Sequence, residues 1–97
     1  MQFSWDPQKS DANHRRRGFD FAFASLIFEG PTLEREDTRR DYGERRIIAI
    51  GLAAGLELTV CYTDRLPAGG ELERRIVSAR RSSHRERKAY QEAIKSR

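Results

Sequence analysis

The alternation of apolar and polar residues over positions 56–63 constrains the fold of this chain more than any other feature. The apolar positions are Leu56, Leu58, Val60 and Tyr62. A period of two is that of a β-strand with one buried face. Residues 45–51 and 72–79 predict two further strands, and the links between the three strands, a turn ending at Gly55 and a loop over residues 66–70, have hairpin length. We therefore expect the three strands to pair antiparallel.

Two helices are predicted before these strands. Asp6 and Pro7 begin the first, because aspartate accepts hydrogen bonds from free N–H groups and proline suits the first helical position. The first helix runs to about residue 17, where Gly18 can adopt the left-handed conformation that ends it. Asp20 caps a second helix over residues 21–28.

A third helix is predicted at the C-terminal end. Ser83 and Glu86 stand three residues apart, as in a capping box, and the helix continues to about residue 96. Residues 3–5 suggest a short strand, and the charged residues 32–41 an irregular strand or loop. The sequence thus predicts one α+β domain over residues 1–97, with an antiparallel β-sheet, two N-terminal helices, one C-terminal helix and all helices packed on one side.

Two large apolar residues lie off the apolar face of the second helix. Phe23 and Leu26 lie roughly 100° and 160° from the centre of that face. The residues that form the face are Phe21, Ala24, Ile27 and Phe28. Phe23 and Leu26 therefore predict a surface that binds a partner. The alternative is a short helix buried on more than one side.

Several classes of protein are excluded. The chain has no apolar run near the roughly 20 residues of a membrane span and begins with no signal peptide, so we expect a cytoplasmic protein without a membrane partner. Its one cysteine, Cys61, cannot form an internal disulfide or a thiolate cluster. No set of ligand-type residues has metal-binding spacing, and no glycine-rich phosphate loop is present, so no cofactor or metal is expected.

Positive charge is concentrated in the C-terminal quarter. Residues 74–97 hold nine basic and two acidic side chains, a net charge of +7. Residues 1–73 hold ten basic and thirteen acidic side chains, a net charge of −3. A field of this kind attracts polyanions such as RNA. The alternative is a solvated helix whose charges form ion pairs.

Short motifs follow one another in a definite order along residues 3–92. They are Phe3-Ser4-Trp5-Asp6-Pro7, then Asn13 and Gly18, Phe21 with Ala24 and Phe28, Glu44-Arg45, a strand ending at Gly51, Tyr62-Thr63 with Arg65, Arg75-Ile76-Val77-Ser78-Ala79-Arg80, and Arg85-Glu86-Arg87 with Tyr90. In this order and near this spacing the chain resembles the BrnT-type toxins.

The resemblance implies a small RelE-like ribonuclease toxin of a type II toxin–antitoxin pair, which cleaves RNA to inhibit translation. It also implies a cognate BrnA-like antitoxin with a ribbon-helix-helix domain, a hetero-oligomer with it, and contact with operator DNA only through that antitoxin. Many members of the family carry Lys-His where this chain has Arg16 and Arg17. A histidine acid or base is therefore not available at that place.

RNA cleavage on such a fold needs help for attack by the 2′-hydroxyl, positive charge on the pentavalent phosphate, and help for the leaving 5′-oxygen. Arginine suits the second role without a metal, because its charged fork binds two phosphate oxygens. For the metal-independent endoribonuclease that the resemblance implies, the candidate catalytic residues are Arg45, Arg75, Arg80 and Glu86. The candidate RNA-binding residues are Arg46, Arg81, Arg85, Arg87 and Lys88.

Other interpretations of the same residues stay open. The arginines can form surface ion pairs with Glu44, Glu71 or Glu73, and Glu86 can serve only to cap its helix. At the level of the whole protein, the alternatives are a non-catalytic RNA- or DNA-binding regulatory module and an interaction protein with solvated charges. RNA cleavage without Mg²⁺ would distinguish the toxin from both.

Overall fold

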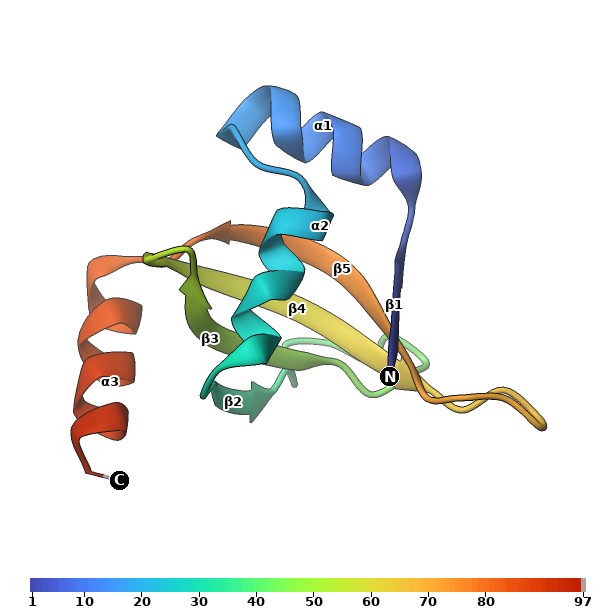
Figure 1. The fold of residues 1–97 in the computed structure, drawn as a ribbon. Helices are drawn as coiled ribbons and strands as arrows, with labels where there is room; N and C mark the ends of the chain where they lie inside the picture. The colour runs from blue at the N-terminus through green and yellow to red at the C-terminus, as the bar shows by residue number, and fades with distance from the viewer. Residues whose placement is uncertain (97) are drawn as a thin grey trace.

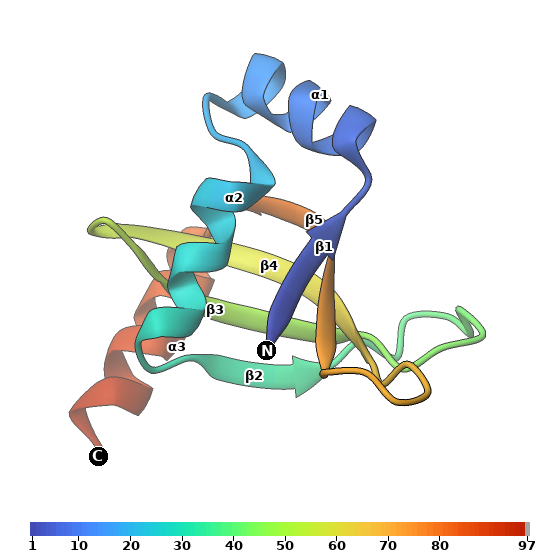
Figure 2. The same ribbon diagram turned by 45° about the vertical axis from the view of Figure 1, so that its right-hand side comes forward.

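The computed structural model describes residues 1–96 and shows a five-stranded sheet with helices against both of its faces (Figures 1 and 2). In chain order the elements are β1 (Gln2–Trp5), α1 (Pro7–Arg17), α2 (Phe21–Ala24), the 3₁₀-helix η1 (Ser25–Glu29), β2 (Leu33–Glu36), β3 (Ile47–Ala53), β4 (Leu56–Arg65), β5 (Glu73–Arg81) and α3 (His84–Lys95). Arg97, the last residue of the basic segment, lies outside the described residues. None of the helices within residues 1–96 is long and apolar enough to cross a membrane.

The sheet is mixed, which corrects the prediction of a wholly antiparallel sheet. Its strand order is β1-β5-β4-β3-β2. The pairs β2–β3, β3–β4 and β4–β5 are antiparallel, as the hairpin-length links predict for the last two. β1 pairs parallel to β5, with Gln2 beside Glu73 and Trp5 beside Ile76. The cause is non-local: α1, α2 and η1 carry the chain from one edge of the sheet to the other, so β1 and β2 never meet.

The helix ends follow the predicted capping. Asp6 Oδ1 accepts a hydrogen bond from the Gln8 amide at 2.9 Å, and Gly18 ends α1 with φ of 85°. The complete capping box of α3 is present, since the Ser83 side chain accepts from the Glu86 amide and Glu86 accepts from the Ser83 amide. The second predicted helix differs, because after Ala24 it tightens into the 3₁₀ turns of η1, a common way for a helix to end.

The strand alternation divides the sheet into two faces. We call the face that carries Leu58, Val60 and Tyr62 the first face, and the face that carries Thr59, Cys61 and Thr63 the second face. α2 and η1 cover the first face, where the main apolar core lies. The buried core residues are Phe19, Phe21, Ala24, Ile27, Ala49, Ala53, Leu58, Val60, Tyr62, Ile76 and Ala79.

α3 lies against the second face, so the prediction that all helices pack on one side is wrong. Figure 2 shows α3 behind the sheet, α2 in front of it, and α1 above the edge that β1 and β5 form. Arg85 and Ala89 of α3 line a hollow of about 290 Å³ together with Ile48 and Ile50 of β3. Buried Tyr90 anchors the helix at the sheet edge. The reason for this placement is that the β3 alternation leaves apolar surface on the second face as well.

Phe23 and Leu26 do not stand free in solvent. Both are half-buried and pack against the core, and the Phe23 ring lies 6.0 Å from the Phe19 ring. The structure therefore supports the alternative of a short helix buried on more than one side. Their predicted role in partner binding is considered below.

Gly51 gives a direct test of the packing of η1 on β3. A Cβ at this position would lie 2.9 Å from Ile27 Cβ and 3.2 Å from the Ile27 carbonyl oxygen. We expect Gly51→Ala to lower the free energy of unfolding by about 1–3 kcal/mol through overpacking. Urea denaturation measures it.

Gly30→Ala is the matched control, because a Cβ there meets nothing within 4 Å. It should keep the parental stability. Equal stability of the Gly51→Ala protein would show that η1 is not seated closely on β3.

Candidate functional site on the second face of the sheet

The second face carries an array of charged residues between α3 and the loop of residues 37–46. Its floor is β4, where Cys61 is buried. Burial raises the pKa of the Cys61 thiol. Nearby charges also change this pKa: the carboxylates of Asp37 and Glu44 raise it, and the guanidiniums of Arg46 and Arg39 lower it. The loop thus brings its charged side chains within electrostatic reach of the middle of the sheet.

An ion pair between Arg80 and Glu86 stands at the α3 side of this array. Arg80 is opposite Thr59 in the β4–β5 register, which places it on the second face. Its two terminal nitrogens donate to the two oxygens of Glu86 at 2.7 and 2.8 Å. Glu86 also accepts from the Ser83 amide at 2.7 Å, so the capping box fixes the carboxylate that holds the arginine.

The pairing sets the charge states of both groups. Hydrogen bonding to Arg80 lowers the pKa of Glu86 to about 2, against the opposing effect of burial. The same hydrogen bonds raise the pKa of Arg80, while the positive charge of Arg39 acts in the opposite direction. A carboxylate with so low a pKa is a weak proton acceptor. The pair therefore favours a capping and positioning role for Glu86 over that of a general base.

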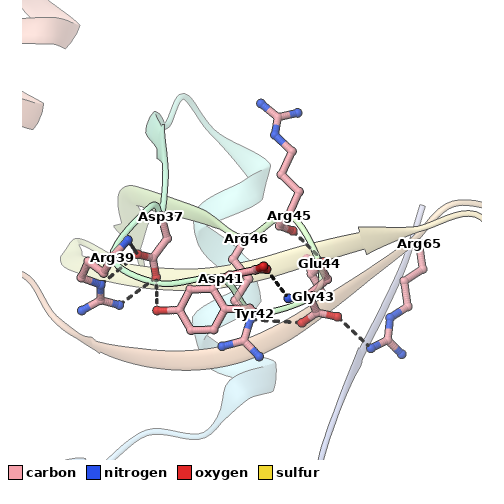
Figure 3. Close-up of polar contacts among 10 residues, drawn as sticks. Asp37, Arg39, Asp41, Tyr42, Gly43, Glu44, Arg45, Arg46 and Arg65 are labelled. Carbon is pink, nitrogen blue, oxygen red and sulfur yellow. Dashed lines mark hydrogen bonds and ion pairs between the residues drawn. The ribbon is translucent and has the colours of Figure 1, made fainter.

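Asp37 organises the loop (Figure 3). Its buried carboxylate accepts from Arg39 Nε and Nη2, each at 2.8 Å, and from the Tyr42 hydroxyl at 3.1 Å. Hydrogen bonding to Arg39 is the main cause that lowers the pKa of Asp37. The Arg46 guanidinium lies over the Tyr42 ring at 4.1 Å from its centroid, so the loop and the start of β3 are held together.

Glu44 links Arg46 to the end of β4. It accepts from Arg46 Nε at 3.1 Å and from Arg65 Nη2 at 3.5 Å, as Figure 3 shows. Hydrogen bonding to Arg46 lowers the pKa of Glu44. Arg75 is opposite Thr63, on the second face, and lines a small hollow with Arg46 and Arg65. This second group of arginines lies toward the other end of β5 from Arg80.

The structure brings some of the predicted site residues together and separates others. Arg46, Arg75, Arg80 and Glu86 belong to the second face. Arg45 does not, because strand alternation turns it the other way from Arg46, and its Nε donates to Glu36 at 2.6 Å. Its side chain points away from the network in Figure 3. The structure therefore places Arg45 on the other face from Arg75 and Arg80, and it separates those two along β5.

The predicted RNA-binding residues are similarly divided. Arg81 is opposite Leu58 and lies on the first face, in a hollow with His14 and Arg17. On α3, Arg85 lines the hollow against β3, while Arg87 donates to the Ser82 carbonyl at 2.9 Å and Lys88 is exposed.

Asp37, Arg39 and Tyr42 are site residues that the sequence did not predict. Their segment has neither helical nor strand periodicity, so nothing in the sequence indicates which way their side chains point. The one local signal is the Asp37-Thr38-Arg39 spacing, which suits a turn closed by an ion pair.

The second face can hold anionic groups with arginine side chains. Within residues 1–96, no group of three or more His, Cys, Asp or Glu side chains is arranged to hold a metal ion. Arg80, nearly half exposed at 47 %, is fixed by a carboxylate and still open to a large ligand. A guanidinium held in this way suits a phosphate whose charge increases during a reaction.

Comparison with protein families gives one match. The family described as "Ribonuclease toxin, BrnT, of type II toxin-antitoxin system" matches residues 5–86, which include every element from α1 to β5. No curated protein matches the chain in sequence.

The Arg80–Glu86 pair predicts a pH dependence of stability. Because the pKa of Glu86 falls from 4.5 to about 2 on folding, the contribution of the pair is complete above about pH 4.5 and is lost as the pH falls toward 2. We expect Glu86→Gln to remove this part of the acid sensitivity. Urea denaturation at a series of pH values between 5 and 2 measures it.

Glu92→Gln, on the exposed side of the same helix, is the control and should follow the parent protein. If the Glu86→Gln and parent proteins lose stability in parallel over this range, the pair does not persist in solution.

Proposed function

Because the chain belongs to the BrnT family of ribonuclease toxins of type II toxin–antitoxin systems, we propose that it cleaves RNA on the second face of its sheet, in a RelE-like manner and without a metal ion. Cleavage of RNA by the protein would inhibit translation in the cytoplasm. The observation that carries the proposal is Arg80, which donates two hydrogen bonds to a fixed carboxylate and is open to solvent.

Arg80 has the chemistry that the transition state requires. The 2′-hydroxyl loses its proton to water as its oxygen bonds to the neighbouring phosphorus, and negative charge accumulates on the non-bridging oxygens. The bond to the 5′-oxygen then breaks, and that oxygen takes up a proton from water. A guanidinium already in place stabilises that charge without reorganisation. Glu86 is the positioning residue, since it orients Arg80 and is itself fixed by the Ser83 amide. Arg85 and Lys88 on the adjacent helix add attraction for the RNA strand.

Arg80→Ala tests this proposal. Loss of one charged donor to the developing oxyanion should reduce the rate of RNA cleavage by roughly 10²–10³ and relieve growth arrest in bacteria. The measurement is cleavage of purified RNA in the presence of EDTA, with circular dichroism to confirm the fold.

Arg15→Ala is the matched control, because Arg15 is an exposed arginine of α1 and its loss changes the net charge equally. If the Arg80→Ala protein folds and cleaves RNA at the parental rate, Arg80 does not belong to the catalytic site. RNA binding without cleavage by the parent would instead support the non-catalytic binding module.

The family implies an antitoxin partner. We propose that this partner is BrnA-like, with a ribbon-helix-helix domain that alone contacts operator DNA in the hetero-oligomer. The proposed interface is on the first face. Half-buried Phe23 lines a hollow of about 340 Å³ there, with Leu56 on its wall, 38 % exposed, and Arg81 beside it. Half-buried Leu26 lies one helical turn beyond Phe23 and would extend the contact.

A carboxylate placed in this hollow should weaken antitoxin binding, because it replaces an apolar contact surface and must lose its hydration in the complex. We expect both Phe23→Glu and Leu56→Glu to weaken binding at least tenfold in calorimetric titration against the cognate antitoxin. The Leu56 variant matters more, since Phe23 also packs on Phe19 and its loss lowers stability.

Leu66→Glu is the control, because Leu66 is 74 % exposed in the loop between β4 and β5 and does not line the hollow. Unchanged affinity of a folded Leu56→Glu protein would place the interface elsewhere.

A further inference from the structure

A small charged hollow lies on the second face, near the start of α1. Its volume is about 140 Å³. Its charged lining consists of Lys9, Arg46, Arg65, Arg75, Asp6 and Glu44. Four cations face two carboxylates, so the lining has an excess of two positive charges. An excess of this kind favours an anion in the hollow.

Both carboxylates are already engaged by the protein. Asp6 accepts from the Gln8 amide as the cap of α1, and Glu44 accepts from Arg46 and Arg65. Glu44 therefore neutralises part of the positive charge and bridges the two guanidiniums. A ligand anion would share these arginines with Glu44.

Arg75 is the arginine of this hollow that no carboxylate of the described residues holds. It is half-buried, and within residues 1–96 it has neither an ion pair nor a side-chain hydrogen bond. In the adjacent position of β1, the Ser4 hydroxyl is also buried without a hydrogen-bond partner among those residues. Polar groups removed from water are normally satisfied, so this edge of the second face holds more donors than the protein itself uses.

We infer that this hollow binds a phosphate group of the RNA strand other than the one that is cleaved. The inference rests on the proposed function and adds a second anchoring point for the substrate. Arginine forks and an ammonium group suit a tetrahedral anion, whose oxygens point toward several donors at once. Arg75 and Arg80 are separated by five positions of β5, roughly 16 Å at the rise of a strand. A phosphate held at Arg80 thus leaves the hollow free for another.

The first experiment measures binding of inorganic phosphate by nuclear magnetic resonance of the arginine side chains. We expect Arg75→Ala and Arg65→Ala each to weaken binding about tenfold, because each removes a charge-assisted hydrogen bond. Glu44→Gln should tighten it several-fold by releasing Arg46 and Arg65. Arg15→Ala, with the same change in charge outside the hollow, should bind as the parent does.

Because Arg65 is exposed, Arg65→Ala should fold even if Arg75→Ala does not, and it then tests the inference alone. Phosphate affinity that is the same in Arg65→Ala, Glu44→Gln and the parent would overturn the inference.

The second experiment distinguishes an RNA phosphate from free phosphate. Short RNAs are prepared with one neutral methylphosphonate linkage at each position flanking the cleaved bond. In the parent, one flanking position should slow cleavage about tenfold, and in Arg75→Ala the same substitution should have no further effect.

An equal effect in both proteins would overturn the inference. If the parent binds inorganic phosphate in the hollow but cleaves no RNA, the proposed function fails, and free phosphate replaces RNA as the ligand of the hollow.

Discussion

The close approach of η1 to β3 determines how the two faces of the sheet are used. Ile27 is fully buried and sits where Gly51 has no side chain, so the first face is sealed by a helix only a few residues long. Because β4 alternates, the same strand that supplies Leu58 and Val60 to this contact presents Thr59 and Cys61 to the other side. The apolar core thus fixes which face of the sheet can carry charge.

On the second face, several arginines are held by carboxylates. Arg80 pairs with Glu86, Arg39 with Asp37, and Arg46 with Glu44. These pairs orient the guanidiniums before any ligand arrives, and they reduce the repulsion between like charges on one surface. Their value lies in the geometry they impose, and an anion that enters the surface exchanges one acceptor for another.

Local signals in the sequence predicted local structure well. The caps of α1 and α3 and the course of β4 follow from short-range chemistry, and all three are confirmed. The parallel β1–β5 pair and the position of α3 depend on which distant segments meet, and no local pattern records that. At the candidate site, Arg45 and Arg46 were equivalent in sequence. Only the register of β3 separates them, and a shift by one residue exchanges their faces. Asp37 lies in a segment without helical or strand periodicity, so the sequence could not predict the direction of its side chain.

The pairing of β1 with β5 has a consequence for the order in which the molecule is completed. β1 is synthesised well before its partner in the sheet, residues 73–76 of β5. Until that partner is synthesised, Gln2–Trp5 has no place in the sheet, and Arg75 has not yet been added. Contacts of such long sequence separation also form slowly, because a long loop must close first. A chain synthesised only as far as β4 therefore lacks Arg75 and the paired edge of β1 and β5.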